Sequence, residues 1–145
     1  MAILKGDKIV YAIRFTNELD EQTLRVRYQT TGGRSISADD VEVNTKDIDG
    51  VDYGNVTETV NFEGLMSIND PALEQLKQHI KQKKFAEILE INIDTLDAVV
   101  GKYKINSLDF EYPDEENATY SMEARLIGET TEETLTEVPE GATSI

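Results

Sequence analysis

The sequence contains no cysteine and a single histidine, His79. Without cysteine, the chain has no disulfide scaffold, no thiol nucleophile and no cysteine-ligated zinc. One histidine leaves no Ser–His–Asp set that can be assembled, and its place beside a predicted apolar helix stripe is typical of a boundary residue. The glycine pair in "TGGR" (31–34) precedes no helix, so it is not a phosphate-binding loop. These absences argue against an enzyme.

Long hydrophobic runs are missing as well. The N-terminal stretch "MAILKGDKIVYAI" has apolar runs too short for a signal peptide or a membrane helix. We therefore expect a soluble protein with no membrane partner, made in a cytoplasm. At 145 residues the chain is long enough for one domain with its own core.

Basic residues are scarce, with 14 against 29 acids and a formal net charge of −15. Affinity for nucleic acid comes largely from neutralising phosphates, so a chain this acidic is a poor DNA or RNA binder. The charge is consistent with simple solubility. It also fits a surface that nucleic acid must pass without sticking.

Most of the remaining sequence alternates between apolar and polar residues, which predicts strands. In one such stretch Val60 and Phe62 share a face while Thr59 and Asn61 share the other. Another stretch shows a phase slip that indicates a β-bulge near Asn106–Ser107. The predicted strands are 7–15, 23–30, 55–68, 85–93, 102–112 and 118–128, and "DTLDAVVG" (94–101) is predicted as a loop.

One segment, "NDPALEQLKQHIKQKK" (69–84), has the pattern of a helix. Asp70 is a good N-cap and Pro71 suits the first helical position. Leu73, Leu76 and Ile80 fall on one face at helical spacing. The fold class that follows is mainly β, an antiparallel sandwich or barrel-like fold with one flanking helix and one solvated sheet face.

A polar segment, "RSISADDVEVNTKDIDGVDYGN" (34–55), separates two of the predicted strands. It shows no sustained period and is predicted as a long polar loop, which in a compact domain is commonly functional or disordered. Asp47, Asp49 and Gly50 sit at EF-hand-like positions, but Thr45 and Val56 occupy the first and twelfth positions and no helices flank them. Calcium binding is therefore disfavoured, and we expect no metal or other cofactor.

Taken together, these motifs resemble the major tail proteins of long-tailed phages of Gram-positive hosts. The resemblance is carried by "YQT" (28–30) followed by polar residues and "TKD" (45–47), by the "DP-x-L-x-x-L" helix start, and by the closing "YP…ATYSMEARLIG". It covers nearly the whole chain. It implies one tail-tube domain at 1–129, with the long loop at 30–55, and an acidic C-terminal arm at 130–145.

The resemblance further implies a structural subunit of the virion tail. Six copies would close a ring, and rings would stack into a hollow tube through which DNA passes without specific binding. Partners would be the chain itself and the tape-measure, tail-tip and tail-terminator proteins, with assembly in the host cytoplasm. Expected channel-lining residues are Thr57, Thr59, Asn61, Glu63, Thr119, Ser121 and Glu123. Expected inter-subunit residues are Ser35, Asp39, Asp40, Thr45, Lys46, Asp47, Lys77, Lys81 and Lys84.

Two other interpretations fit the sequence. The same fold could serve in the tube of a contractile tail or an injection system. Alternatively, the chain could be a stand-alone acidic β-domain that binds a protein partner and stays monomeric at high concentration.

Overall fold

The computed structural model describes residues 3–16, 21–47, 49–68 and 70–139. Over these residues the chain forms a short 3₁₀ turn, seven strands and one helix. The elements are η1 (Gly6–Lys8), β1 (Ile9–Thr16), β2 (Glu21–Arg25), β3 (Gln29–Asn44), β4 (Asp49–Leu65), α1 (Pro71–Lys81), β5 (Ala86–Asn92), β6 (Asp97–Glu111) and β7 (Thr119–Thr134).

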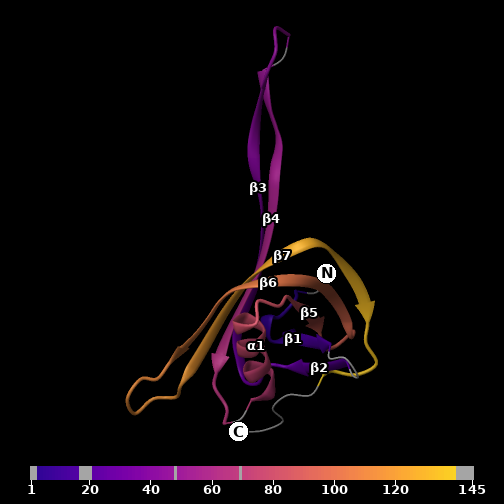
Figure 1. Ribbon diagram of the computed structural model, residues 1–145. Helices are drawn as coiled ribbons and strands as arrows, with labels where there is room; N and C mark the ends of the chain where they lie inside the picture. Colours follow the sequence, from indigo (N-terminus) through magenta and orange to yellow (C-terminus); the bar gives the residue numbers. More distant parts are fainter. Residues whose placement is uncertain (1–2, 17–20, 48, 69, 140–145) are drawn as a thin grey trace.

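The strands form one antiparallel sheet in the order β2-β1-β5-β6-β7-β4-β3. The sheet curls, so that β6 and β7 arch over β1 and β5 (Figure 1). Gln29 at the start of β3 closes the curl. Its side-chain carbonyl accepts a hydrogen bond from the Tyr11 N–H at 2.9 Å, and its amide donates to the Tyr11 carbonyl at 2.6 Å. The mainly β, barrel-like fold class with one helix is confirmed.

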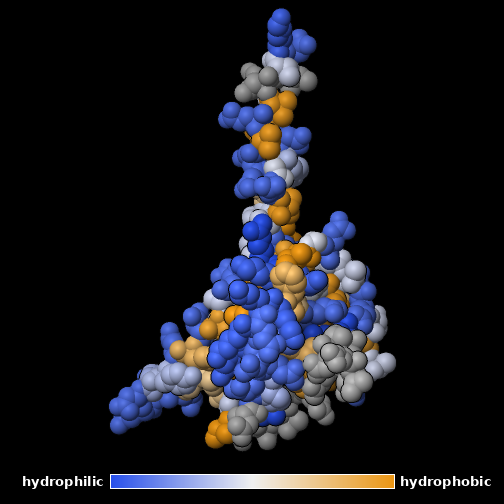
Figure 2. Space-filling model, viewed as in Figure 1, coloured by the Kyte–Doolittle hydropathy of each residue, from blue (hydrophilic) through white to orange (hydrophobic). Residues whose placement is uncertain are grey.

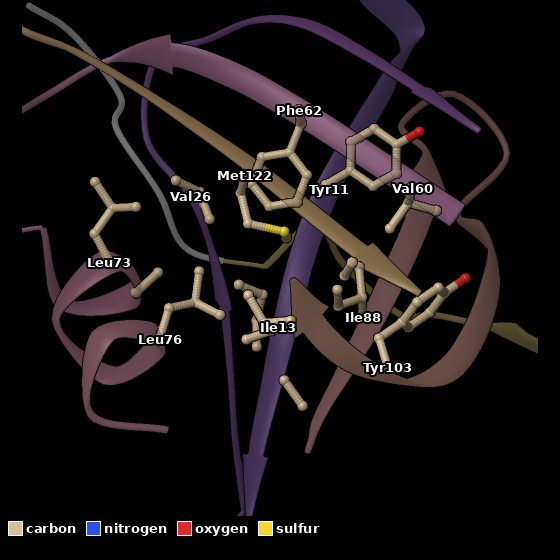
Figure 3. Packing of buried hydrophobic residues seen from close by; sticks show 14 of the residues in the cluster. Tyr11, Ile13, Val26, Val60, Phe62, Leu73, Leu76, Ile88, Tyr103 and Met122 are labelled. Atoms are coloured by element: carbon tan, nitrogen blue, oxygen red, sulfur yellow. The ribbon is translucent and has the colours of Figure 1, made fainter. Parts of the chain in front are cut away.

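A large cluster of buried side chains fills the inside of the curl (Figure 3). The rings of Tyr11 and Phe62 stack with centroids 5.1 Å apart, and Tyr120 meets Phe62 edge-on. Leu73 and Leu76 of α1 point into the same cluster. The helix therefore buries its apolar stripe on the sheet, and this burial is the main favourable term in folding.

The helix begins where the sequence predicts. One carboxylate oxygen of buried Asp70 accepts a hydrogen bond from the Ala72 N–H at 3.0 Å, and the other accepts from the Arg27 N–H at 3.1 Å. Pro71 follows at the first helical position. One side chain therefore caps the helix and fixes the turn between β2 and β3.

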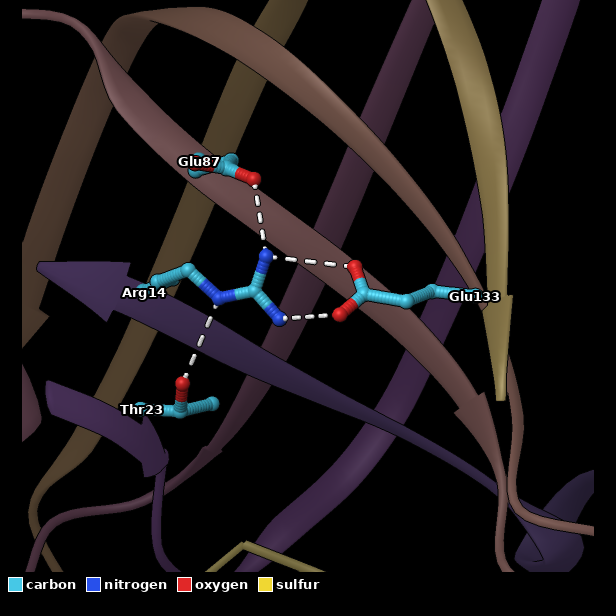
Figure 4. Close-up of polar contacts among 4 residues, drawn as sticks. All are labelled: Arg14, Thr23, Glu87 and Glu133. Atoms are coloured by element: carbon cyan, nitrogen blue, oxygen red, sulfur yellow. Dashed lines mark hydrogen bonds and ion pairs between the residues drawn. The ribbon is translucent and has the colours of Figure 1, made fainter. Parts of the chain in front are cut away.

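A second, smaller apolar cluster lies on β1, β5 and β6, on the face opposite the main core. Beside it, Arg14 of β1 forms ion pairs with Glu87 and Glu133 at 3.0 Å each (Figure 4). The Arg14 side chain is only 13% exposed, and Glu133 lies near the end of β7. This contact holds the C-terminal part of β7 against β1.

The predicted start of β6 and the predicted end of β7 are wrong, because pairing with neighbouring strands makes both strands longer. β6 begins at Asp97, inside the predicted loop, and its first residues pair with both β5 and β7. β7 runs to Thr134, so the first residues of the predicted arm at 130–145 belong to the sheet. The predicted bulge is confirmed by a register shift between Ile105 and Ser107. Residues 140–145 lie outside the described residues.

The prediction of a loop at 30–55 is also wrong, because these residues belong to two long strands. β3 and β4 pair from Gln29–Gly64 to Asn44–Asp49 and extend away from the rest of the molecule (Figure 1). A ribbon that is exposed on both faces needs no alternation to pair its backbones, so the pattern failed to reveal it. A register shift places Gly54 and Asn55 opposite Asp39. Residues 37–56 are called the projecting hairpin below, and the remaining described residues the body.

Candidate assembly surfaces

The structure brings together the residues expected to line a channel. Asn61 of β4 lies directly opposite Glu123 of β7, and Glu63 lies opposite Ser121. Their strand neighbours Phe62 and Met122 are buried in the core on the other face. The pairing therefore makes one continuous polar surface from two segments some sixty residues apart.

This polar face is wider than the sequence indicates. Ser107, Asp109 and Glu111 of β6 lie opposite Glu123, Ser121 and Thr119. On the other side, β3 adds Thr31, Gly33 and Ser35 opposite residues of β4. Sequence analysis located the bulge in β6 but did not assign these β6 residues to the polar face, and it missed the strand β3. The polar face thus spans four strands in the order β6-β7-β4-β3.

Charge on the polar face is divided along the strands. Glu63, Glu123, Asp109 and Glu111 lie toward the β6–β7 turn. Further along, Lys104 of β6 lies directly opposite Arg125 of β7, and both are exposed. The polar face therefore carries an acidic band and then a basic pair, where the sequence predicted only neutral and acidic residues.

Two strand edges bound this four-stranded region, and neither has a second partner strand within the described part of the chain. β3 pairs with β4 alone. β6 pairs with β5 only as far as Tyr103, so residues 104–111 have β7 on one side and, among the described residues, no strand on the other. Unpaired edges expose rows of N–H and C=O groups that can pair with another chain.

The projecting hairpin carries apolar side chains in the open (Figure 2). On the face that continues the core side of the sheet, the exposed fraction exceeds 60% for Val51, Tyr53 and Val56 of the hairpin and for Ile36 just before it. A two-stranded ribbon is marginally stable by itself in water. A row of exposed apolar residues on such a ribbon indicates a surface that another molecule covers.

Arg34 lies at the base of the projecting hairpin and ties it to the body. Its Nε donates to Glu90 of β5 at 3.1 Å, and its Nη1 lies 3.6 Å from Glu58 of β4. The Tyr11 hydroxyl donates to the same Glu90 carboxylate at 3.0 Å. Burial, followed by the negative charge of Glu90, raises the pKa of Tyr11. These contacts connect β1, β3, β4 and β5 at the point where the hairpin leaves the body.

The expected hairpin contact residues lie on the projecting part or at its start. Ser35, Asp39, Asp40, Thr45, Lys46 and Asp47 are all exposed. Of the helix lysines, Lys77 forms a salt bridge with Glu74 at 3.2 Å and lies over the Phe110 ring. Lys81 and Lys84 are exposed near the end of α1. His79 packs edge-on against Phe15, as expected for a boundary residue.

Neither a membrane helix nor a metal cluster is found in the described part of the chain. Within 3–16, 21–47, 49–68 and 70–139, α1 falls short of the length and hydrophobicity required to cross a membrane. Over the same residues, no three acidic or histidine side chains are grouped to hold a metal ion.

A family model for the phage tail tube protein matches residues 3–132, nearly the whole chain. The chain belongs to the phage tail tube protein family. The resemblance found in the sequence is thus confirmed, and with it a structural tail component rather than an enzyme. The family description names no host, so a Gram-positive host stays a prediction.

Solved structures share the fold of this tail tube protein at low sequence identity. The SPP1 tail tube matches with a TM-score of 0.79 and 14% identity, over 92% of this chain and 82% of that one. The tail of an empty gene transfer agent particle, refined with C6 symmetry, matches with a TM-score of 0.72 and 16% identity, over 89% and 98%. The baseplate of the anti-feeding prophage matches with a TM-score of 0.62 and 9% identity, over 94% and 98%. No curated protein matches.

Proposed function

We propose that copies of this tail tube protein close into a ring by pairing β3 of one copy with residues 104–111 of β6 in the next. The observation that carries the proposal is the pair of free edges bounding one polar face. Edge pairing satisfies the exposed backbone groups of both strands and removes an aggregation-prone edge. The polar face then becomes a continuous wall.

The strand directions are compatible with such closure. The four strands alternate in direction, because each neighbouring pair is antiparallel. Rotation about a tube axis preserves the direction of every strand. The β3 strand of one copy therefore runs antiparallel to β6 of the next, and the alternation continues around the ring. Six copies are proposed, in line with the C6 symmetry of the gene transfer agent tail.

The polar face is proposed to line the channel. Its Thr, Ser, Asn and acidic side chains would neither bind phosphate nor displace its counterions, so DNA could pass without being held. The opposite face is filled by the buried core and covered by α1, so it faces away from the channel. The proposed lining residues are Thr57, Thr59, Asn61, Glu63, Thr119, Ser121 and Glu123 from the sequence, with Ser107, Asp109 and Glu111 added by the structure.

The projecting hairpin is proposed to join one ring to the next. β3 and β4 run from the polar face into the hairpin without interruption, so the outer part of the hairpin extends beyond its own ring along the channel wall. Its exposed apolar row would be buried on a neighbouring copy. At the tube ends these surfaces would stay open for the tail-tip and tail-terminator proteins, and the channel would hold the tape-measure protein.

Self-assembly tests this function directly. The purified chain is followed by light scattering and negative-stain microscopy over a concentration series, with preformed tubes as seeds in parallel samples. We expect rings and then hollow tubes without any added cofactor. A protein that stays monomeric at millimolar concentration, seeded or not, would favour the stand-alone domain instead.

A further inference from the structure

The basic pair on the polar face brings two like charges together at the β6 edge. Lys104 and Arg125 lie directly opposite each other on neighbouring strands, an arrangement that is destabilising for like charges. Among the described residues neither has an ion-pair partner. Lys104 is also the first residue of the free β6 edge. An anion supplied from the far side of that edge would relieve the repulsion.

Only part of the β3 edge is available to a neighbouring copy. Its first residue, Gln29, is bonded to Tyr11 and to the Val26 carbonyl. Gly32 lies against the Tyr11 ring so closely that a Cβ there would come within 2.5 Å of it. From Gly33 onward, no strand of the described residues other than β4 pairs with β3. A neighbour therefore pairs most readily with the stretch that begins there and continues toward the hairpin.

Barrel geometry fixes how far the two edges are offset. Strands of a closed barrel tilt by about 35–45°, which displaces each strand by roughly one residue relative to the next. Over four strands the offset is about four residues. With no offset, Lys104 would face Ser35, because both lie in one row across the sheet with Thr59 and Arg125. An offset of four places Lys104 opposite either Thr31 or Asp39.

The choice between these two registers follows from the available edges. Placing Thr31 opposite Lys104 would carry β6 past the start of β3, into the turn where Tyr28 has a φ of 54°. Placing Asp39 opposite Lys104 keeps residues 104–111 of β6 beside residues 33–39 of β3. It also keeps like faces together, because Asp39 and Lys104 both belong to the polar side of the sheet.

We infer that Asp39 of one copy lies directly opposite Lys104 of the neighbouring copy and forms an ion pair with it on the channel wall. The partner is thus a second copy of this chain, and the inference rests on the proposed ring. The carboxylate also approaches Arg125 and so reduces the positive charge that passing DNA would meet. In this register Ser37, Ser35 and Gly33 face Ser107, Asp109 and Glu111.

Engineered cysteines test the register, because the native chain has none to interfere. Directly opposite residues in an antiparallel pair lie within the Cα separation of about 4.4–6.8 Å that a disulfide requires. The double variant Asp39→Cys/Lys104→Cys should form a ladder of covalent oligomers up to the closed ring on mild oxidation. The matched variant Ser35→Cys/Lys104→Cys, displaced by about 13 Å in this register, should give little. Equal cross-linking in both variants, or stronger cross-linking in the second, would overturn the inference.

Charge reversal provides an independent test. Asp39→Lys should raise the critical concentration for tube formation about tenfold, equivalent to about 1.4 kcal/mol. Adding Lys104→Asp to it should restore most of the loss. Asp94→Lys, in the exposed turn between β5 and β6, is the control and should change little. If the wild type forms tubes and Asp39→Lys assembles equally well, the proposed ion pair is contradicted but the proposed ring is not. If the wild type forms no rings, the proposed function fails and this inference fails with it.

Discussion

β3 and β4 each belong to two different environments along their length. In the body Phe62 of β4 is 1% exposed and packs between two tyrosine rings. Nine residues earlier on the same strand, Tyr53 is 81% exposed. The backbone pairing is similar in both places, so hydrogen bonding alone does not separate them. The difference is the presence of a core, which the proposed contact with another copy would supply to the hairpin.

The sharpest way to test this comparison is to remove the hairpin. Replacing residues 39–55 with Asn-Gly joins Ala38 to Val56, which are directly opposite each other. Asn-Gly is favoured in two-residue hairpin turns. We expect a folded monomer whose unfolding free energy changes by less than about 1 kcal/mol, with tube formation abolished. Circular dichroism melts and light scattering measure the two effects.

This replacement starts beyond Arg34, because that residue is bonded to Glu90 and belongs to the body. A variant that melts without cooperativity would show that the hairpin contributes to the core. A variant that still polymerises at the wild-type concentration would show that the hairpin is not the joint between rings.

The next largest effect is expected from truncating one aromatic residue in the body and one in the hairpin. Phe62→Ala should lower the unfolding free energy by about 3–5 kcal/mol, as is usual for a buried aromatic. Tyr53→Ala should lower that of the monomer by less than about 0.5 kcal/mol, yet weaken assembly. Urea unfolding of the monomer and the critical concentration for tubes separate the two. Equal losses of monomer stability would mean that Tyr53 is covered within its own chain.

Removing a buried or an exposed cation should show a smaller difference in unfolding free energy. Arg14→Ala removes a largely buried cation shared by Glu87 and Glu133, whose side chains are 37% and 43% exposed. Because solvent screens these carboxylates, we expect a loss of about 1–2 kcal/mol. Lys77→Ala removes an exposed i,i+3 pair with Glu74 and should cost less than about 0.5 kcal/mol. Both are measured by urea unfolding at low and at high salt. An Arg14→Ala variant as stable as the wild type would show that the contact with β7 is dispensable.

The smallest effect expected is a loss of stability at alkaline pH. Burial raises the pKa of Tyr11, Tyr103 and Tyr120 in the folded chain, whereas the unfolded chain ionises tyrosine near pH 10. Above that pH the unfolded state binds fewer protons than the folded one, so the unfolding free energy falls as pH rises. Tyr120→Phe should flatten this fall between about pH 9 and 11 in urea unfolding. An unchanged slope in Tyr120→Phe would contradict the assignment.

Local patterns in the sequence determined much of this protein. Asp70 and Pro71 mark the helix start because capping and proline geometry depend only on adjacent residues. Alternation identified Val60, Phe62, Tyr120 and Met122 as core, and therefore Asn61, Glu63, Ser121 and Glu123 as the polar side. The phase slip near Asn106 located a bulge. Each of these signals acts over a few residues, so the sequence carries it directly.

The tertiary structure alone decided what pairs with what. The hairpin was missed because its strands bury no face, and so leave no alternation in the sequence. The β6 extension depends on pairing with residues near the end of β7, and the retention of β7 depends on the contact of Arg14 with Glu133, 119 positions along the chain. The free edge of β6 exists because the pairing of β5 with β6 ends at the pair Ala86–Tyr103. Edges, rows and opposed charges are properties of strand order and register, which local sequence does not encode.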